Sequence, residues 1–206
     1  MLERSRLCSG VMIAALLALV SCTGTKLVSQ WKDDQYRGRP AKVFVIVTSH
    51  DRGPRSLVED EFVRQLKARG IVAVASYTVF PPEAKETKED VLSKVDQLGS
   101  DAILVIRFLR KEAGDTYTPL RRYAVPQGFE TSWDAYYGDA VTDVAVRDIS
   151  YDRDVITAET TLYDAATRRP LWSALSDTTY EGAAIKQIKP FSSAIVRGLA
   201  NEKLVP

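Results

Sequence analysis

Three short apolar runs, separated by amphipathic helical segments, constrain the fold of this chain more than any other feature. The runs span residues 41–48, 71–77 and 102–109 and are rich in β-branched and aromatic residues. The first, AKVFVIVT, is almost continuously apolar, which is typical of a strand buried on both faces of a sheet. The order strand, helix, strand, helix, strand, with crossovers of this length, predicts a parallel core with right-handed connections.

The first helical segment has its own start and stop signals. Ser56 and Glu59 have the S-x-x-E spacing of a capping box, which predicts that the helix begins at Leu57. Gly70 is expected to end it. Its apolar face is made by residues spaced four apart, namely Val58, Phe62 and Leu66.

A second helix is predicted to begin after Thr87 and to end at Gly99, again with apolar residues on one face: Val91, Val95 and Leu98. On the wet face of the first helix, Asp60 and Arg64 are four residues apart, and we expect them to form a solvated pair.

The carboxyl-terminal part predicts antiparallel structure. Residues 141–146 are interpreted as a short strand, and residues 155–164 and 171–179 as a hairpin whose alternation gives one buried face. A final helix has Pro190 in its first turn and apolar residues at four-residue spacing: Phe191, Ile195 and Leu199. The predicted fold class is therefore α/β: a mixed sheet with a parallel β-α-β-α-β core, a C-terminal antiparallel hairpin and a closing helix.

Residues 112–140 form a long connection that is rich in glycine, proline and aromatic residues. A connection of this length inside a compact domain is either functional or disordered, and its aromatic content favours order. Its aromatic residues are Tyr117, Tyr123, Phe129, Trp133, Tyr136 and Tyr137.

The amino end has the features of an export signal. Arg4 and Arg6 precede ten apolar residues, 11–20, a run too short to span a bilayer as a helix. The chain has two cysteines, Cys8 within this segment and Cys22 directly after it. Removal of residues 1–21 leaves 185 residues with Cys22 as the single thiol, so the mature chain is expected to form neither an internal disulfide nor a cysteine-based metal site.

The residues Leu19-Val20-Ser21-Cys22 resemble the lipobox of bacterial lipoproteins. The resemblance implies cleavage after Ser21, a diacylglyceryl thioether on the Cys22 sulfur, and acylation (commonly palmitate) of the new amine. Thr23 stands where many inner-membrane lipoproteins have aspartate, which favours the periplasmic face of the outer membrane. The expected organisation is a signal peptide (1–21), a lipidated tether (22–40) and one α/β domain (41–206) with the aromatic-rich insertion at about 112–140.

The lipobox, the alternating core, the hairpin TTLYDAATRRPLWSA and the closing helix together resemble a broad group of uncharacterised bacterial lipoproteins. Their domain is a small α/β sandwich similar in shape to the amino-terminal domain of TolB. The resemblance covers most of the mature chain and implies no catalytic residue. The insertion at 112–140 departs from shorter relatives, which makes it a candidate for function.

The mature chain carries 26 basic and 26 acidic residues, with both signs interspersed. It therefore lacks the clustered basic surface of a nucleic-acid-binding protein. One histidine and no cysteine beyond Cys22 give no metal-site pattern, and the acidic residues of 139–154 alternate with arginines as on a solvated face. Neither a G-x-S-x-G motif nor a phosphate-binding glycine loop is present.

Two groups of residues are candidates for contact with a ligand or partner. The first is the loop with His50, Asp51, Arg52 and Arg55, which follows the first strand at the edge where open α/β sheets bind ligands. The second is the aromatic set in the insertion, Trp133, Tyr136 and Tyr137, which is suited either to an interface or to covering a sheet edge.

The sequence favours a non-enzymatic lipoprotein of the bacterial cell envelope, anchored through lipid on Cys22, that binds an envelope protein or helps to assemble a complex. The alternative is a periplasmic module that binds a small ligand or glycan through the aromatic segment and the His50 loop. An enzyme is the third hypothesis. No cofactor and no nucleic-acid partner are expected.

Overall fold

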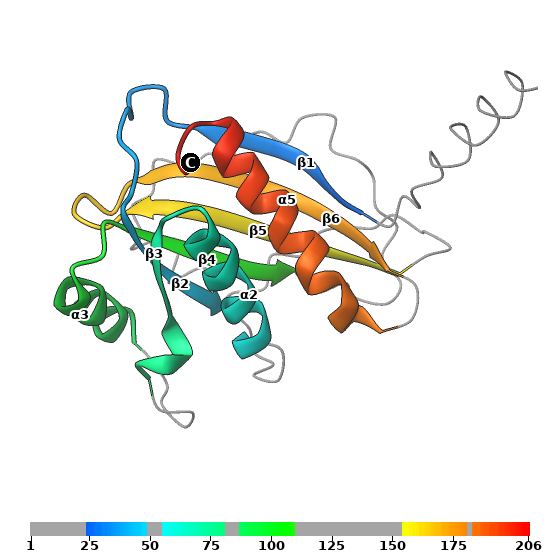
Figure 1. The fold of residues 1–206 in the computed structure, drawn as a ribbon, viewed down its shortest axis with the longest axis horizontal. Helices are drawn as coiled ribbons and strands as arrows, with labels where there is room; N and C mark the ends of the chain where they lie inside the picture. Colours follow the sequence, from blue (N-terminus) through cyan, green and yellow to red (C-terminus); the bar gives the residue numbers. More distant parts are fainter. Residues whose placement is uncertain (1–23, 49–54, 81–86, 110–153, 181–182) are drawn as a thin grey trace, which may run out of the picture.

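The computed structural model describes residues 24–48, 55–80, 87–109, 154–180 and 183–206. Figure 1 shows a single sheet with helices packed on it. The strands are β1 (Thr25–Lys32), β2 (Lys42–Thr48), β3 (Val72–Ala75), β4 (Ala102–Leu109), β5 (Asp154–Asp164) and β6 (Pro170–Tyr180). The helices are α2 (Arg55–Ala68), α3 (Lys88–Leu98) and α5 (Ile188–Asn201), with short 3-10 turns η2 (Ser76–Thr78) and η3 (Ala184–Gln187).

The sheet is mixed, and its six strands lie in the order β1-β6-β5-β4-β2-β3. Strand β2 pairs in parallel with β3 on one side and with β4 on the other, so the predicted parallel core is confirmed. Strands β5 and β6 form the predicted antiparallel hairpin, which joins the core through an antiparallel β4–β5 pair. The predicted α/β fold class is therefore confirmed.

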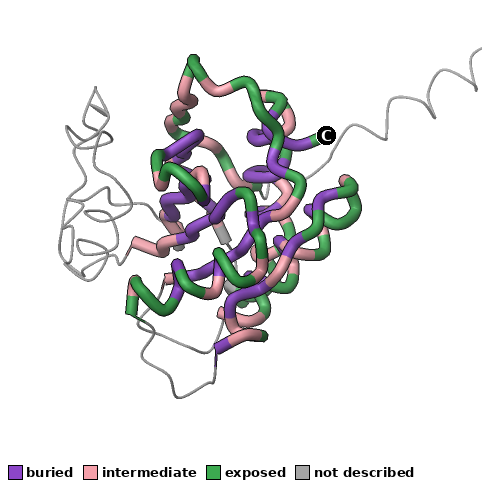
Figure 2. Tube along the Cα trace, turned by 90° about the vertical axis from the view of Figure 1, so that its left-hand side faces the viewer, coloured by how far each residue is buried: buried purple, intermediate pink, exposed green. Residues whose placement is uncertain are grey.

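The helices divide between the two faces of the sheet. Alternate residues of β2 enter different cores: Val43, Val45 and Val47 pack with α2 and α5, whereas Phe44 and Ile46 pack with α3. Both faces of β2 and β4 are thus buried, which explains their nearly continuous apolar sequence. In Figure 2 the buried stretches run through the middle of the molecule and exposed segments lie around them.

Local signals set the ends of the helices largely as predicted. The Thr87 side chain accepts a hydrogen bond from the Asp90 N–H, and the Asp90 carboxylate accepts one from the Thr87 N–H, which completes a capping box for α3. Gly99 follows α3 with a positive φ of 60°, and Gly70 follows α2 with a φ of 81°. A side chain is strained in this left-handed conformation, so glycine is favoured at both positions.

The structure differs from the predicted tether at residues 25–32. Strand β1 occupies this segment and pairs antiparallel with β6 at the edge of the sheet, with a bulge between Leu27 and Ser29. The bulge interrupts the two-residue alternation, and an edge strand tolerates the polar residues that suggested a tether. At most Thr23 and Gly24 separate Cys22 from the sheet.

Helix α5 closes the fold over Trp172, which is completely buried. The predicted apolar face of α5 is confirmed, since Phe191, Ile195 and Leu199 are all buried. Within the described parts of the chain, no helix has the length and apolar character needed to cross a membrane. The predicted insertion at 112–140 and the predicted strand at 141–146 lie outside the described residues.

Candidate functional site

Most of the residues singled out from the sequence lie outside the described part of the chain. These are Cys22, His50, Asp51, Arg52, Trp133, Tyr136 and Tyr137. Arg55 is the one candidate that the structure describes, and it belongs to a buried polar cluster that the sequence did not reveal.

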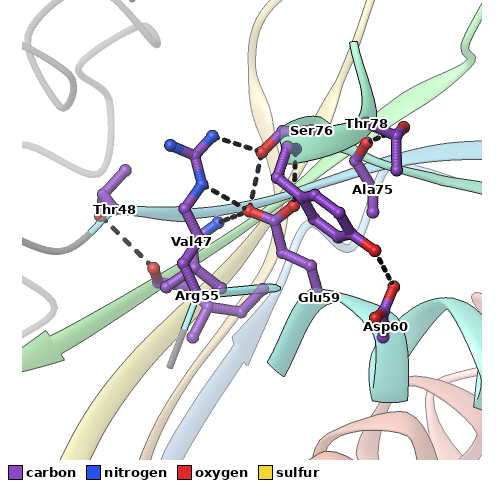
Figure 3. A network of polar contacts seen from close by, with 10 residues as sticks. Val47, Thr48, Arg55, Glu59, Asp60, Ala75, Ser76 and Thr78 are labelled. Carbon is purple, nitrogen blue, oxygen red and sulfur yellow. Dashed lines mark hydrogen bonds and ion pairs between the residues drawn. The ribbon is translucent and has the colours of Figure 1, made fainter. Parts of the chain in front are cut away.

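The centre of this cluster is the carboxylate of Glu59, a residue with no exposed surface. Its Oε1 atom accepts hydrogen bonds from the Val47 N–H at 3.0 Å, from Arg55 Nε at 3.0 Å and from the Ser76 hydroxyl at 2.7 Å. Its Oε2 atom accepts one from the Tyr77 N–H at 3.0 Å. Figure 3 shows these groups converging on the carboxylate.

Arg55 and Ser76 complete the cluster. The Arg55 guanidinium donates through Nη2 to the Ser76 hydroxyl at 2.6 Å while its Nε contacts Glu59. Ser76 is fully buried, and the Arg55 side chain keeps 17% of its surface exposed. The buried negative charge is thus compensated by one arginine and by three further donors, as burial of a carboxylate requires.

Three chain segments meet at this carboxylate. Val47 lies near the carboxyl end of β2, Arg55 begins α2, and Ser76 begins the 3-10 turn that follows β3. All three are at the carboxyl edge of the parallel strands, where α/β sheets place their functional loops. The Glu59 cluster, which we define as Val47, Arg55, Glu59, Ser76 and Tyr77, ties these segments to one another.

The predicted capping box on the first helix is wrong. Helix α2 begins at Arg55, so Ser56 lies inside it, and the Glu59 carboxylate binds groups from β2, η2 and Arg55 instead. These tertiary donors offer a buried, charge-compensated site, whereas a cap would leave the carboxylate at the surface. One feature of the sequence points to this burial. Glu59 lies three positions before Phe62 and seven before Leu66, which places its charge on the apolar stripe of the helix.

The predicted pair between Asp60 and Arg64 is also wrong. Arg64 binds Glu61 through two hydrogen bonds of 2.7 and 2.6 Å, and this contact is the main cause that lowers the pKa of Glu61. The Asp60 carboxylate instead accepts a hydrogen bond from the Tyr77 hydroxyl at 2.6 Å, which raises the pKa of that phenol. Asp60 thereby adds an exposed contact beside the buried cluster.

A second buried ion pair joins β4 to β5. Arg107 Nε lies 3.1 Å from Glu159 Oε2, and the two side chains are 15% and 6% exposed. Arg107 is also the register partner of Thr48 on β2, so the pair sits near the same edge of the sheet as the Glu59 cluster.

The chemistry of the Glu59 cluster is that of a structural clamp. Each carboxylate oxygen already accepts hydrogen bonds, and the Ser76 hydroxyl donates to one charged group and accepts from the other. Because these polar groups bind one another, the network holds the three segments in place and leaves none of its groups directed at a substrate for proton transfer. Among the described residues, no group of three or more His, Cys, Asp or Glu is arranged to hold a metal ion.

A scan against models of protein families finds no match to this chain, and neither does a search of curated proteins. Among solved structures, the PelC dodecamer from Paraburkholderia phytofirmans aligns with a TM-score of 0.45 at 12% identity, covering 85% of this chain and 94% of that chain. Lipoprotein GNA1162 from Neisseria meningitidis aligns with a TM-score of 0.42 at 15% identity, covering 79% of this chain and 98% of that chain. At these values no property of either protein transfers to this chain.

Proposed function

We propose that this protein is a lipoprotein of the bacterial cell envelope, held on the periplasmic face of the outer membrane by acyl chains on Cys22. The observation that carries the proposal is the apolar run 11–20, which ends in Leu19-Val20 and is followed at once by Ser21-Cys22. Each buried methylene contributes about 0.8 kcal/mol, and one chain alone gives only reversible binding. Two or three chains on one cysteine give stable anchoring.

The domain itself serves as a non-catalytic module that binds another envelope protein or helps to assemble a complex. Its balanced charge gives no attraction for nucleic acid, and the polar cluster at the carboxyl edge of the sheet is engaged in holding the fold together. The proposed contact surface is the aromatic set Trp133, Tyr136 and Tyr137, because aromatic side chains with a polar group are enriched at protein interfaces.

Metabolic labelling with an alkyne analogue of palmitate tests the anchor. Wild type should incorporate the label and remain with membranes after a high-salt wash. Cys22→Ala should lose both, whereas Cys8→Ala should keep both because Cys8 leaves with the signal peptide. Equal labelling of wild type and Cys22→Ala would contradict the proposed anchor.

Crosslinked capture from the native envelope tests the binding role. The comparison is wild type against a variant with Trp133→Ala, Tyr136→Ala and Tyr137→Ala, both shown to be folded and lipidated. A stoichiometric protein partner that is lost in the variant supports the assembly role. Capture of the same partner by both chains would refute the proposed contact surface.

A further inference from the structure

The position of β1 determines which end of the sheet lies next to Cys22. The antiparallel register pairs Thr25 with Thr178 near the end of β6, and Thr178 in turn with Ile156 near the start of β5. The start of β1 therefore lies at the same end of the sheet as the carboxyl ends of the parallel strands (Figure 1).

The chain between the anchor and the sheet is too short to let the domain turn freely. Cys22 and Thr25 are three residues apart, so their Cα atoms are separated by at most about 11 Å when the chain is extended. Strand β1 itself, with eight residues, is roughly 27 Å long. The distant end of the sheet, where β3 begins at Val72, is not held close to Cys22 in this way.

The surface at this end has the composition of a membrane-contacting site. Turn η3 follows β6 closely, and its Ile185 side chain is 56% exposed, although Ile188 of α5 packs against the core. The neighbouring Lys186 and Lys189 are exposed. An exposed apolar side chain beside lysines fits a bilayer interface, where the apolar group enters the headgroup region and the cations meet phosphates.

Lys189 interacts with one acidic residue, Glu61, which is bound more directly by Arg64 and Gln65. The interaction with Lys189 is the smallest of those that lower the pKa of Glu61, so most of the Lys189 charge is available to an anionic surface.

We propose that the surface formed by Ile185, Lys186 and Lys189 rests on the phospholipid bilayer. This inference depends on the proposed function, since lipid on Cys22 brings the surface to the membrane. The anchor and the surface together fix the orientation of the domain, with the start of β3 pointing into the aqueous space.

Quenching of a fluorescent probe by brominated lipids tests this orientation on the full lipidated protein. A thiol-reactive bimane is attached to Ile185→Cys or, as the matched control, to Val72→Cys, since Val72 is 55% exposed at the opposite end of the sheet. Thioether formation on Cys22 leaves the introduced cysteine as the single free thiol. The protein is reconstituted in vesicles of phosphatidylethanolamine and phosphatidylglycerol with brominated acyl chains.

The inference predicts strong quenching of the probe at position 185 and none at position 72. Quenching at neither position, or equal quenching at both, by a protein that is lipidated and floats with the vesicles would overturn the inference and leave the proposed anchor intact. An intact mass without acyl chains, together with failure to float, would instead overturn the proposed anchor and with it the inference.

Charge reversal tests the role of the lysines. Lys186→Glu combined with Lys189→Glu, introduced into the position-185 probe, should abolish its quenching. The control combines Lys67→Glu with Lys203→Glu, two exposed positions remote from η3, and should retain it. Unchanged quenching after reversal at 186 and 189 would overturn the contact of these lysines with lipid phosphates.

Discussion

Replacement of Glu59 by glutamine should destabilise the fold strongly while preserving the size of the side chain. The glutamine oxygen can occupy the place of Oε1, which accepts from Val47, Arg55 and Ser76 in the wild type. Its NH₂ group then faces the Tyr77 N–H, which leaves two donors opposed in a site without exposed surface.

The magnitude follows from the bonds that change. A buried donor left without an acceptor costs about 1–3 kcal/mol, and the hydrogen bond from Ser76 to a neutral oxygen loses roughly half of its charge-assisted strength. Loss of one partner from a buried ion pair costs about 3–5 kcal/mol in other proteins. We therefore expect a loss of about 3–5 kcal/mol, which corresponds to a fall in Tm of roughly 6–20 °C for a domain of this size.

Urea denaturation followed by circular dichroism measures this loss on the mature chain with Cys22→Ser. The matched control is Glu61→Gln on the same helix, which removes a partner of the exposed Arg64 and should leave the midpoint almost unchanged. A Glu59→Gln midpoint indistinguishable from that of Glu61→Gln would refute the clamp.

Two further predictions concern packing and pH. Gly198→Val should lower the free energy of unfolding by about 1–3 kcal/mol, because even a Cβ atom at this position lies 3.0 Å from Leu27 and 3.2 Å from Trp172. Urea denaturation measures this loss, and a variant as stable as wild type would contradict the close packing of α5 on β1 and β6. The pKa of Asp90 is lowered by its hydrogen bonds with Thr87, so the stability that it contributes is present above its ordinary pKa of 3.8 and is lost as the pH falls through the lowered value. Asp90→Asn should therefore flatten the decline of the urea midpoint below about pH 4, and a decline as steep as that of wild type would refute the contribution of this cap.

The sequence predicted the elements whose signals are local and strong. Residues 102–109 were predicted as a strand and form β4, because an apolar run of this length, interrupted only by Arg107, has no exposed alternative in a small domain. Thr87 and Gly99 bound α3 because a capping side chain and a left-handed glycine act within a few residues.

The elements that depend on distant partners were not predictable in the same way. Strand β1 is recognisable only through its pairing with β6, since its residues are largely polar and its bulge interrupts the alternation. Glu59 matched a local capping pattern, but donors from β2 and η2, which lie 12 and 18 residues away, determine where its carboxylate lies. Of the candidate contact residues, only Arg55 falls within the described chain, and its role in the clamp required the position of Ser76 to be known.

The most direct test of the anchor at the centre of this account is the mass of the amino-terminal tryptic peptide from the membrane-bound protein. Proteolysis after Lys26 should release a peptide that begins at Cys22 and carries a diacylglyceryl group together with an amide-linked acyl chain. A peptide that contains Cys22 with a free thiol, or one that begins upstream of it, would contradict the account.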